Sequence, residues 1–109
     1  MKKPISVSVV SGEILKIIAN STELVKKIGI FGSLARGTFN DDSDIDILIE
    51  YAATPDFEPE RYLMFCKLCN QIIDRLDEQY DRNVDLVHFE NDPAITLFDE
   101  NVGKEVVWL

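Results

Sequence analysis

The chain has 109 residues, of which 46% are hydrophobic and 28% charged; this ordinary globular composition excludes disordered and fibrous proteins. Its 20 acidic residues against 11 basic ones give a formal net charge of −9, which excludes a general affinity for nucleic acid or anionic membranes. The length predicts a single domain over residues 1–109.

No segment has the pattern of a targeting signal or a membrane span. The apolar stretch over residues 5–10 contains serines and is too short for the hydrophobic part of a signal peptide. No other apolar run approaches the length of a membrane helix. We therefore expect a cytoplasmic protein without membrane contact.

The first part of the chain predicts an extended arm, a helix and a strand. Residues 5–10 alternate between apolar and serine side chains, which predicts the arm. Ser11 is suited to cap a helix over residues 12–20. An apolar run predicts a strand over residues 24–31, followed by a glycine-containing turn, a short helical piece and a turn at Asn40–Ser43.

The remainder predicts two strands separated by a long helix. Residues 44–51 read as a strand that places three isoleucines on one face, and residues 84–89 as another strand. Apolar positions recur at helical spacing over residues 62–80. A short helix over 93–101 and a terminal strand or docking segment at 106–109 complete the series. This alternation of helices and strands predicts a two-layer α/β fold.

Three aspartates are candidates for metal binding. Asp44 and Asp46 lie two positions apart at the start of a strand, so their side chains leave the same face. Asp85 is the second residue of another apolar strand and joins them if the two strands are neighbours. Carboxylates are the ligands that Mg²⁺ prefers, and three such groups repel each other without a cation.

The preceding turn supplies groups that suit a phosphate. Gly32 allows the backbone to approach a ligand closely, and the Ser33 hydroxyl and nearby N–H groups donate hydrogen bonds to phosphate oxygens. Phosphate donors beside metal-binding carboxylates are the equipment for phosphoryl or nucleotidyl transfer by a pair of metal ions.

The sequence Gly-Ser-Leu-Ala-Arg-Gly at residues 32–37, followed by Ser-Asp-Ile-Asp at residues 43–46 and by Asp85 in a later strand, resembles a known family. This family is the minimal nucleotidyltransferases, the smallest branch of the DNA polymerase beta-like superfamily, which includes the MntA-type antitoxins. The resemblance covers nearly the whole chain. It implies the nucleotidyltransferase fold, a small mixed β-sheet with helices packed on one face.

The resemblance also implies roles for the motif residues. Asp44 and Asp46 would bind two Mg²⁺ ions, and Asp85 would complete the site and help to activate the attacking hydroxyl. Gly32 and Ser33 would hold the triphosphate of ATP. Arg36 would contact the substrate or a partner.

By the same resemblance, the protein would transfer AMP from ATP to a tyrosine of a HEPN-type ribonuclease toxin and act as its antitoxin. Larger relatives carry additional domains that build the acceptor pocket. We therefore expect the acceptor site to come from a partner, a homo-oligomer or an open cleft. Two alternatives stay open: a non-catalytic antitoxin or scaffold that acts by binding, and nucleotidyl transfer to a small molecule.

Three further residues have a structural interpretation. Cys66 and Cys69 form a Cys-x-x-Cys pair, but both lie on the apolar side of the predicted long helix and no second ligand pair exists in the sequence. We expect them to be core residues. His88 is the only histidine, and we expect a strand residue without a catalytic role.

Overall fold

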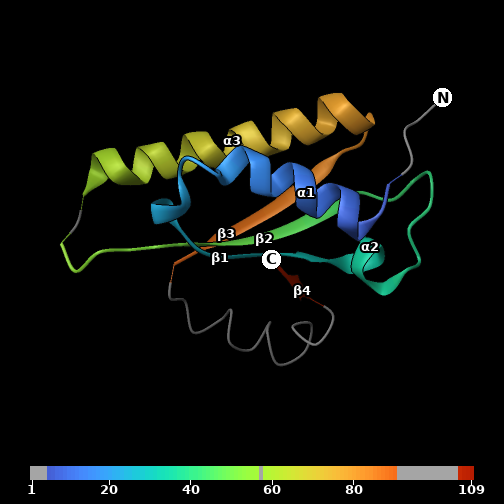
Figure 1. The fold of residues 1–109 in the computed structure, drawn as a ribbon, viewed down its shortest axis with the longest axis horizontal. Coiled ribbons are helices and arrows are strands. Elements are labelled where there is room, and N and C mark those ends of the chain that lie inside the picture. Colours follow the sequence, from blue (N-terminus) through green and yellow to red (C-terminus); the bar gives the residue numbers. More distant parts are fainter. Residues whose placement is uncertain (1–4, 57, 91–105) are drawn as a thin grey trace.

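The computed structural model describes residues 5–56, 58–90 and 106–109, and within these ranges four strands form one sheet (Figure 1). In chain order the elements are α1 (Val7–Ile18), the 3-10 helix η1 (Thr22–Leu24), β1 (Val25–Phe31), α2 (Gly32–Arg36), β2 (Ile45–Tyr51), α3 (Pro59–Tyr80), β3 (Val84–Phe89) and β4 (Val107–Trp108). The order across the sheet is β3-β2-β1-β4. β2 and β3 are parallel, whereas β1 is antiparallel to β2 and β4, so the sheet is mixed.

Both long helices, α1 and α3, lie on the same face of this sheet, and α2 lies at the end of β1 (Figure 1). The core is the apolar layer between these helices and the sheet. Its largest fully buried side chains include Val10 and Ile14 of α1, Ile30 of β1, Ile45, Ile47 and Ile49 of β2, and Phe65, Ile72 and Leu76 of α3. The predicted two-layer fold, with helices on one face of a mixed sheet, is confirmed.

The strand and helix predicted for the middle of the chain are also confirmed. The three isoleucines of β2 are completely buried, and strand alternation directs Asp46 to the other face. α3 begins at Pro59. Proline is suited to the first turn of a helix, because the N–H group that it lacks would have no helical partner there. The helix ends at Asp81, whose φ of +52° is left-handed.

The predictions for the N-terminal segment are wrong in two respects. Residues 7–10 belong to α1 and form no extended arm, and Ser6 caps the helix in place of Ser11. The Ser6 hydroxyl oxygen accepts a hydrogen bond from the Val9 N–H at 3.2 Å. The helix extends back to residue 7 because Val10 then continues the buried stripe of α1 by one turn.

The terminal strand expected at 106–109 is confirmed as β4, which pairs with β1. The Leu109 N–H donates a hydrogen bond to the Ile28 carbonyl at 2.9 Å. The predicted helix over 93–101 lies outside the described residues. None of the helices in the described ranges combines the length and the hydropathy that a membrane crossing requires.

Candidate active site

Three chain segments meet at the end of the sheet where β1 ends and where β2 and β3 begin. Phe31 at the end of β1 pairs with Asp46 of β2, and Asp46 pairs on its other side with Asp85 of β3. Neighbouring strands lie about 4.8 Å apart, so Asp46 and Asp85 are adjacent positions. The expectation that the strand of Asp85 lies beside the strand of Asp46 is confirmed, and Gly32 follows Phe31 directly into the same region.

Gly32 is required by the way in which this turn closes against β2. Its φ is +72°, in the left-handed region, and an ideal Cβ at this position would lie only 2.1 Å from Oδ2 of Asp46. A side chain would therefore overlap the Asp46 carboxylate. α2 starts at Gly32 itself and ends at Gly37, which confirms the short helical piece expected there.

Ser33 and Arg36 both lie on α2, which packs against β2 near the carboxylates. Ser33 is partly buried in the first turn of this helix, and Arg36 is exposed in its last turn. The structure therefore brings both residues to the end of the sheet where the aspartates gather.

The aspartates influence one another electrostatically. The pKa of Asp46 is raised above its ordinary value of 3.8, first because burial removes water from its partly buried carboxylate, and then because Asp85 and Asp44 add negative charge nearby. The positive charge of Arg36 acts in the opposite direction. A cation bound here would relieve the repulsion among the three carboxylates.

These carboxylates are a suitable donor set for a divalent cation that is shared with a nucleotide. Within the described residues, no three His, Cys, Asp or Glu side chains lie close enough together to hold a metal ion by themselves. Mg²⁺ commonly uses only one or two carboxylates and takes its other ligands from water and substrate phosphates. The adjacent pair Asp46 and Asp85 meets that requirement.

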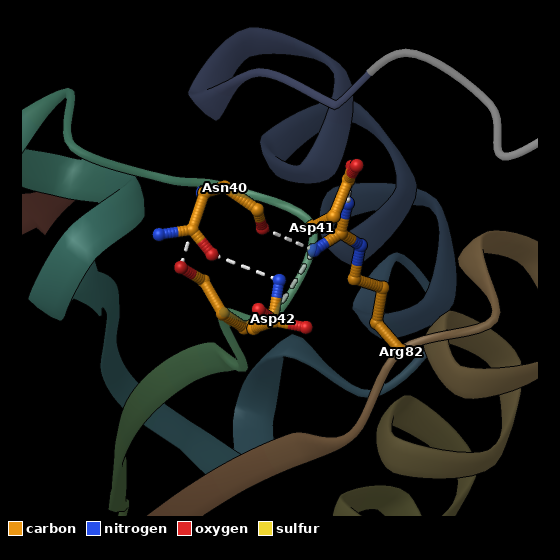
Figure 2. Close-up of polar contacts among 5 residues, drawn as sticks. Asn40, Asp41, Asp42 and Arg82 are labelled. Carbon is orange, nitrogen blue, oxygen red and sulfur yellow. Dashed lines mark hydrogen bonds and ion pairs between the residues drawn. The ribbon is translucent and has the colours of Figure 1, made fainter.

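The structure adds Arg82, a residue that the sequence did not single out. Figure 2 shows its guanidinium group beside the turn Asn40–Ser43, which leads directly into Asp44. Its side chain is only 6% exposed. An isolated arginine between a helix end and a strand carries no burial signal in the sequence, because tertiary packing alone decides its environment.

The two cysteines lie on α3, and the histidine lies on β3 three positions after Asp85. Cys69 belongs to the core and Cys66 is partly buried; neither forms a disulfide, and burial raises the pKa of the Cys69 thiol to about 12. Cys69 is therefore a thiol at neutral pH, as the core interpretation requires. His88 lies in β3 with its ring edge-on to Phe65, the two ring centroids being 6.1 Å apart.

Comparisons with known proteins agree with this arrangement. MJ1215 of Methanocaldococcus jannaschii, provisionally named a protein adenylyltransferase, is 56% identical over 43 residues, which are 36% of this chain and 50% of that protein. The protein adenylyltransferase MntA of Thermococcus cleftensis is 44% identical over 43 residues, 36% of this chain and 43% of that protein. The matched segments thus span about half or less of each curated relative.

A crystal structure of a toxin–antitoxin with AMP-PNP has a similar fold, with a TM-score of 0.59 and 26% identity over 89% of this chain and 69% of that chain. The family model described as "Nucleotidyltransferase domain" matches residues 12–108. This match includes α2, all three aspartates and the four strands around them, so the chain belongs to the nucleotidyltransferase domain family.

Proposed function

We propose that this protein uses ATP and Mg²⁺ to transfer AMP to a hydroxyl of a macromolecular partner, and that the acceptor is a tyrosine of a HEPN-type ribonuclease toxin. The observation that carries the proposal is the pairing of Phe31 with Asp46 and of Asp46 with Asp85, which gathers the glycine-serine turn and the carboxylates. Relatives named as protein adenylyltransferases and the related toxin–antitoxin structure with AMP-PNP support this substrate and this kind of partner.

Each residue has a defined task in this proposal. Asp44, Asp46 and Asp85 would hold the metal ions, and Ser33 would donate a hydrogen bond to the triphosphate. Arg36 would place its positive charge beside the nucleotide phosphates. When bound, Mg²⁺ neutralises phosphate charge and polarises the phosphoryl oxygen.

The reaction is a displacement at the α-phosphorus of ATP. The acceptor hydroxyl oxygen forms a bond to this phosphorus, and the bond from the phosphorus to the oxygen that leads to the β-phosphate breaks. Pyrophosphate leaves, and Asp85 accepts the hydroxyl proton as a general base.

Attachment of AMP to a tyrosine would add a bulky anion to the toxin. If this tyrosine lies near the ribonuclease site, the new charge repels RNA phosphates and the adenosine blocks their approach. Such inhibition persists after the two proteins separate, unlike inhibition by binding alone.

The test is a sub-stoichiometric incubation of this protein with the purified toxin, ATP and Mg²⁺, followed by removal of this protein. We expect the toxin to gain the mass of AMP and to stay inactive. The Asp46→Asn variant should give no transfer, whereas Asp74→Asn, which removes the same charge from the exposed side of α3, should transfer normally.

Two outcomes would reject the proposal. A toxin of unchanged mass that regains full activity after separation indicates a protein that acts by binding. Transfer to free hydroxyl compounds at a rate equal to that for the toxin indicates a small-molecule acceptor, because positioning by a docked partner would then contribute nothing.

A further inference from the structure

Arg82 lies in the two-residue connection between the C-cap of α3 and the first residue of β3. Its side chain is almost completely buried, although its ion-pair partner Asp41 is 95% exposed. A buried guanidinium is costly unless it makes several good polar contacts. The polar contacts of Arg82 therefore indicate which part of the structure its burial stabilises.

Those contacts converge on one turn, as Figure 2 shows. Nη1 donates hydrogen bonds to the carbonyl oxygens of Asn40 at 2.5 Å and Ser43 at 3.2 Å. Nη2 lies 3.5 Å from Oδ1 of Asp41. The guanidinium also lies 4.4 Å from the ring centroid of Phe39, just before the turn. One side chain thus connects both ends of the turn to the start of β3.

Three further hydrogen bonds are internal to the turn. The Ser43 N–H donates to the Asn40 carbonyl at 3.1 Å, the Asn40 N–H to the Ser43 hydroxyl at 3.0 Å, and the Asp42 N–H to Oδ1 of Asn40 at 2.8 Å. These bonds stabilise the shape of the turn, whereas the contacts of Arg82 connect it to the start of β3. Beyond the turn, the Ile45 N–H donates to the Asn83 carbonyl at 3.0 Å. This bond is a second link between the start of β2 and the segment that carries Arg82.

The turn leads directly into Asp44, and Asp85 follows Arg82 by three positions. We propose that Arg82 is a positioning residue, which holds the turn Asn40–Ser43 and thereby places Asp44 beside Asp46 and Asp85. The relevance of this placement to nucleotide binding rests on the proposed function. The placement itself is a property of the metal-free fold.

Arg61 provides a matched control at the opposite end of the sheet. Its Nη2 donates to the carbonyl oxygens of Glu23, before β1, and of Ala52, after β2, the latter at 3.1 Å. For Arg61, as for Arg82, the Nε atom is buried and has no hydrogen-bond partner among the described residues. Arg61→Met therefore removes a similar set of contacts far from the aspartates.

The first measurement is amide hydrogen exchange of the metal-free protein. Loss of a charge-assisted hydrogen bond corresponds to about a tenfold change in a local opening equilibrium. Relative to the slowest-exchanging amides of each variant, Arg82→Met should accelerate exchange at Ser43 and Ile45 by about this factor. Arg61→Met should not. Unchanged protection at both amides in Arg82→Met would overturn the proposal.

The second measurement is the affinity for Mn²⁺ in the presence of ATP, which electron paramagnetic resonance detects. Residues that orient metal ligands typically change metal affinity by about 10–100-fold, which is the loss expected for Arg82→Met. Arg82→Lys keeps the positive charge but offers its N–H donors from a single nitrogen, so it should fold and bind with intermediate affinity. Arg61→Met should bind like the wild type.

The outcomes separate this inference from the proposed function. A wild-type protein that binds no Mn²⁺ with ATP contradicts the proposed function, and the exchange experiment still decides whether Arg82 holds the turn. Equal losses of affinity in Arg82→Met and Arg61→Met show a general effect on stability and overturn the positioning role.

Discussion

Gly32 and Gly37 begin and end α2 with the same left-handed backbone but in different surroundings. Their φ angles are +72° and +80°. A Cβ at Gly32 would overlap the Asp46 carboxylate, whereas nothing lies within 4 Å of a Cβ at Gly37. Substitutions at the two positions therefore separate the cost of backbone strain from the cost of displacing the Asp46 carboxylate.

Alanine at either glycine should destabilise the fold by about 1–2 kcal/mol, the cost of a left-handed L-residue. Only Gly32→Ala should also impair binding of Mn²⁺ with ATP, because the new methyl group must displace Asp46. Urea unfolding and calorimetric titration measure the two effects. Equal binding by both variants would show that the position of Asp46 is unimportant for the nucleotide.

The raised pKa of Asp46 has a predictable effect on stability without metal. The folded chain binds this proton more tightly than the unfolded chain, so the free energy of unfolding falls as the pH rises from the ordinary pKa of 3.8 through the raised value. Asp85→Asn removes one cause of the shift. The pKa of Asp46 should then move down, while burial still keeps it above its ordinary value.

NMR titration of the Asp46 carboxyl carbon checks this expectation. Asp74→Asn, on the exposed side of α3, is the control and should leave the titration unchanged. If Asp85→Asn also leaves it unchanged, the two carboxylates are not coupled.

At the scale of single elements, local patterns predicted β1, β2, α3 and β3 because each has one dominant periodicity. The start of α1 was predicted wrongly. Alternation over residues 5–10 favoured an extended arm, with Ser11 as the cap of the following helix. Packing decides the start, since the helix adds Val10 to the buried core only if it begins before that residue.

Removal of the cap tests this start. Ser6→Ala should lower the free energy of unfolding by about 1 kcal/mol, because the Val9 N–H loses its partner. Ser11→Ala lies inside the helix, where alanine is the better helix former, and should be neutral or slightly stabilising. A larger loss from Ser11→Ala would favour the helix start predicted from the sequence.

The candidate site was predictable from the sequence only in part. The spacing of Gly32, Ser33, Asp44 and Asp46 indicated the candidate site. Asp85 was added on the condition that its strand is a neighbour of β2, which the structure confirms. The register that pairs Asp46 with Asp85 depends on how α3 packs, and the burial of Arg82 depends on a turn about 40 residues earlier. The strand register and the burial of Arg82 both depend on contacts between distant parts of the chain, which local sequence patterns do not predict.

At the scale of the whole molecule, α1 and α3 cover one face of the sheet (Figure 1). Asp46 and Asp85 pair at one end of its strands. Ligand binding at such an end should stabilise the entire cooperative fold, because the site includes residues from β1, β2 and β3.

We therefore expect Mg²⁺ and ATP together to raise the melting temperature. At a ligand concentration 100 times the dissociation constant, the added stability is about 2.7 kcal/mol. ATP in EDTA, or Mg²⁺ alone, should give a much smaller shift, because the carboxylates and the triphosphate share the cations. Differential scanning calorimetry measures the shift. An equal shift with ATP in EDTA would contradict binding through the metal.

The crossover helix α3 also determines when the site can form. Parallel strands such as β2 and β3 need a long connection, and the entropy of closing such a loop delays their pairing during folding. A nascent chain exposes the motif of residues 32–46 well before Asp85 has been synthesised. Assembly of the candidate site therefore has to wait for β3, since a nascent chain that stops before Asp85 lacks one of the three carboxylates.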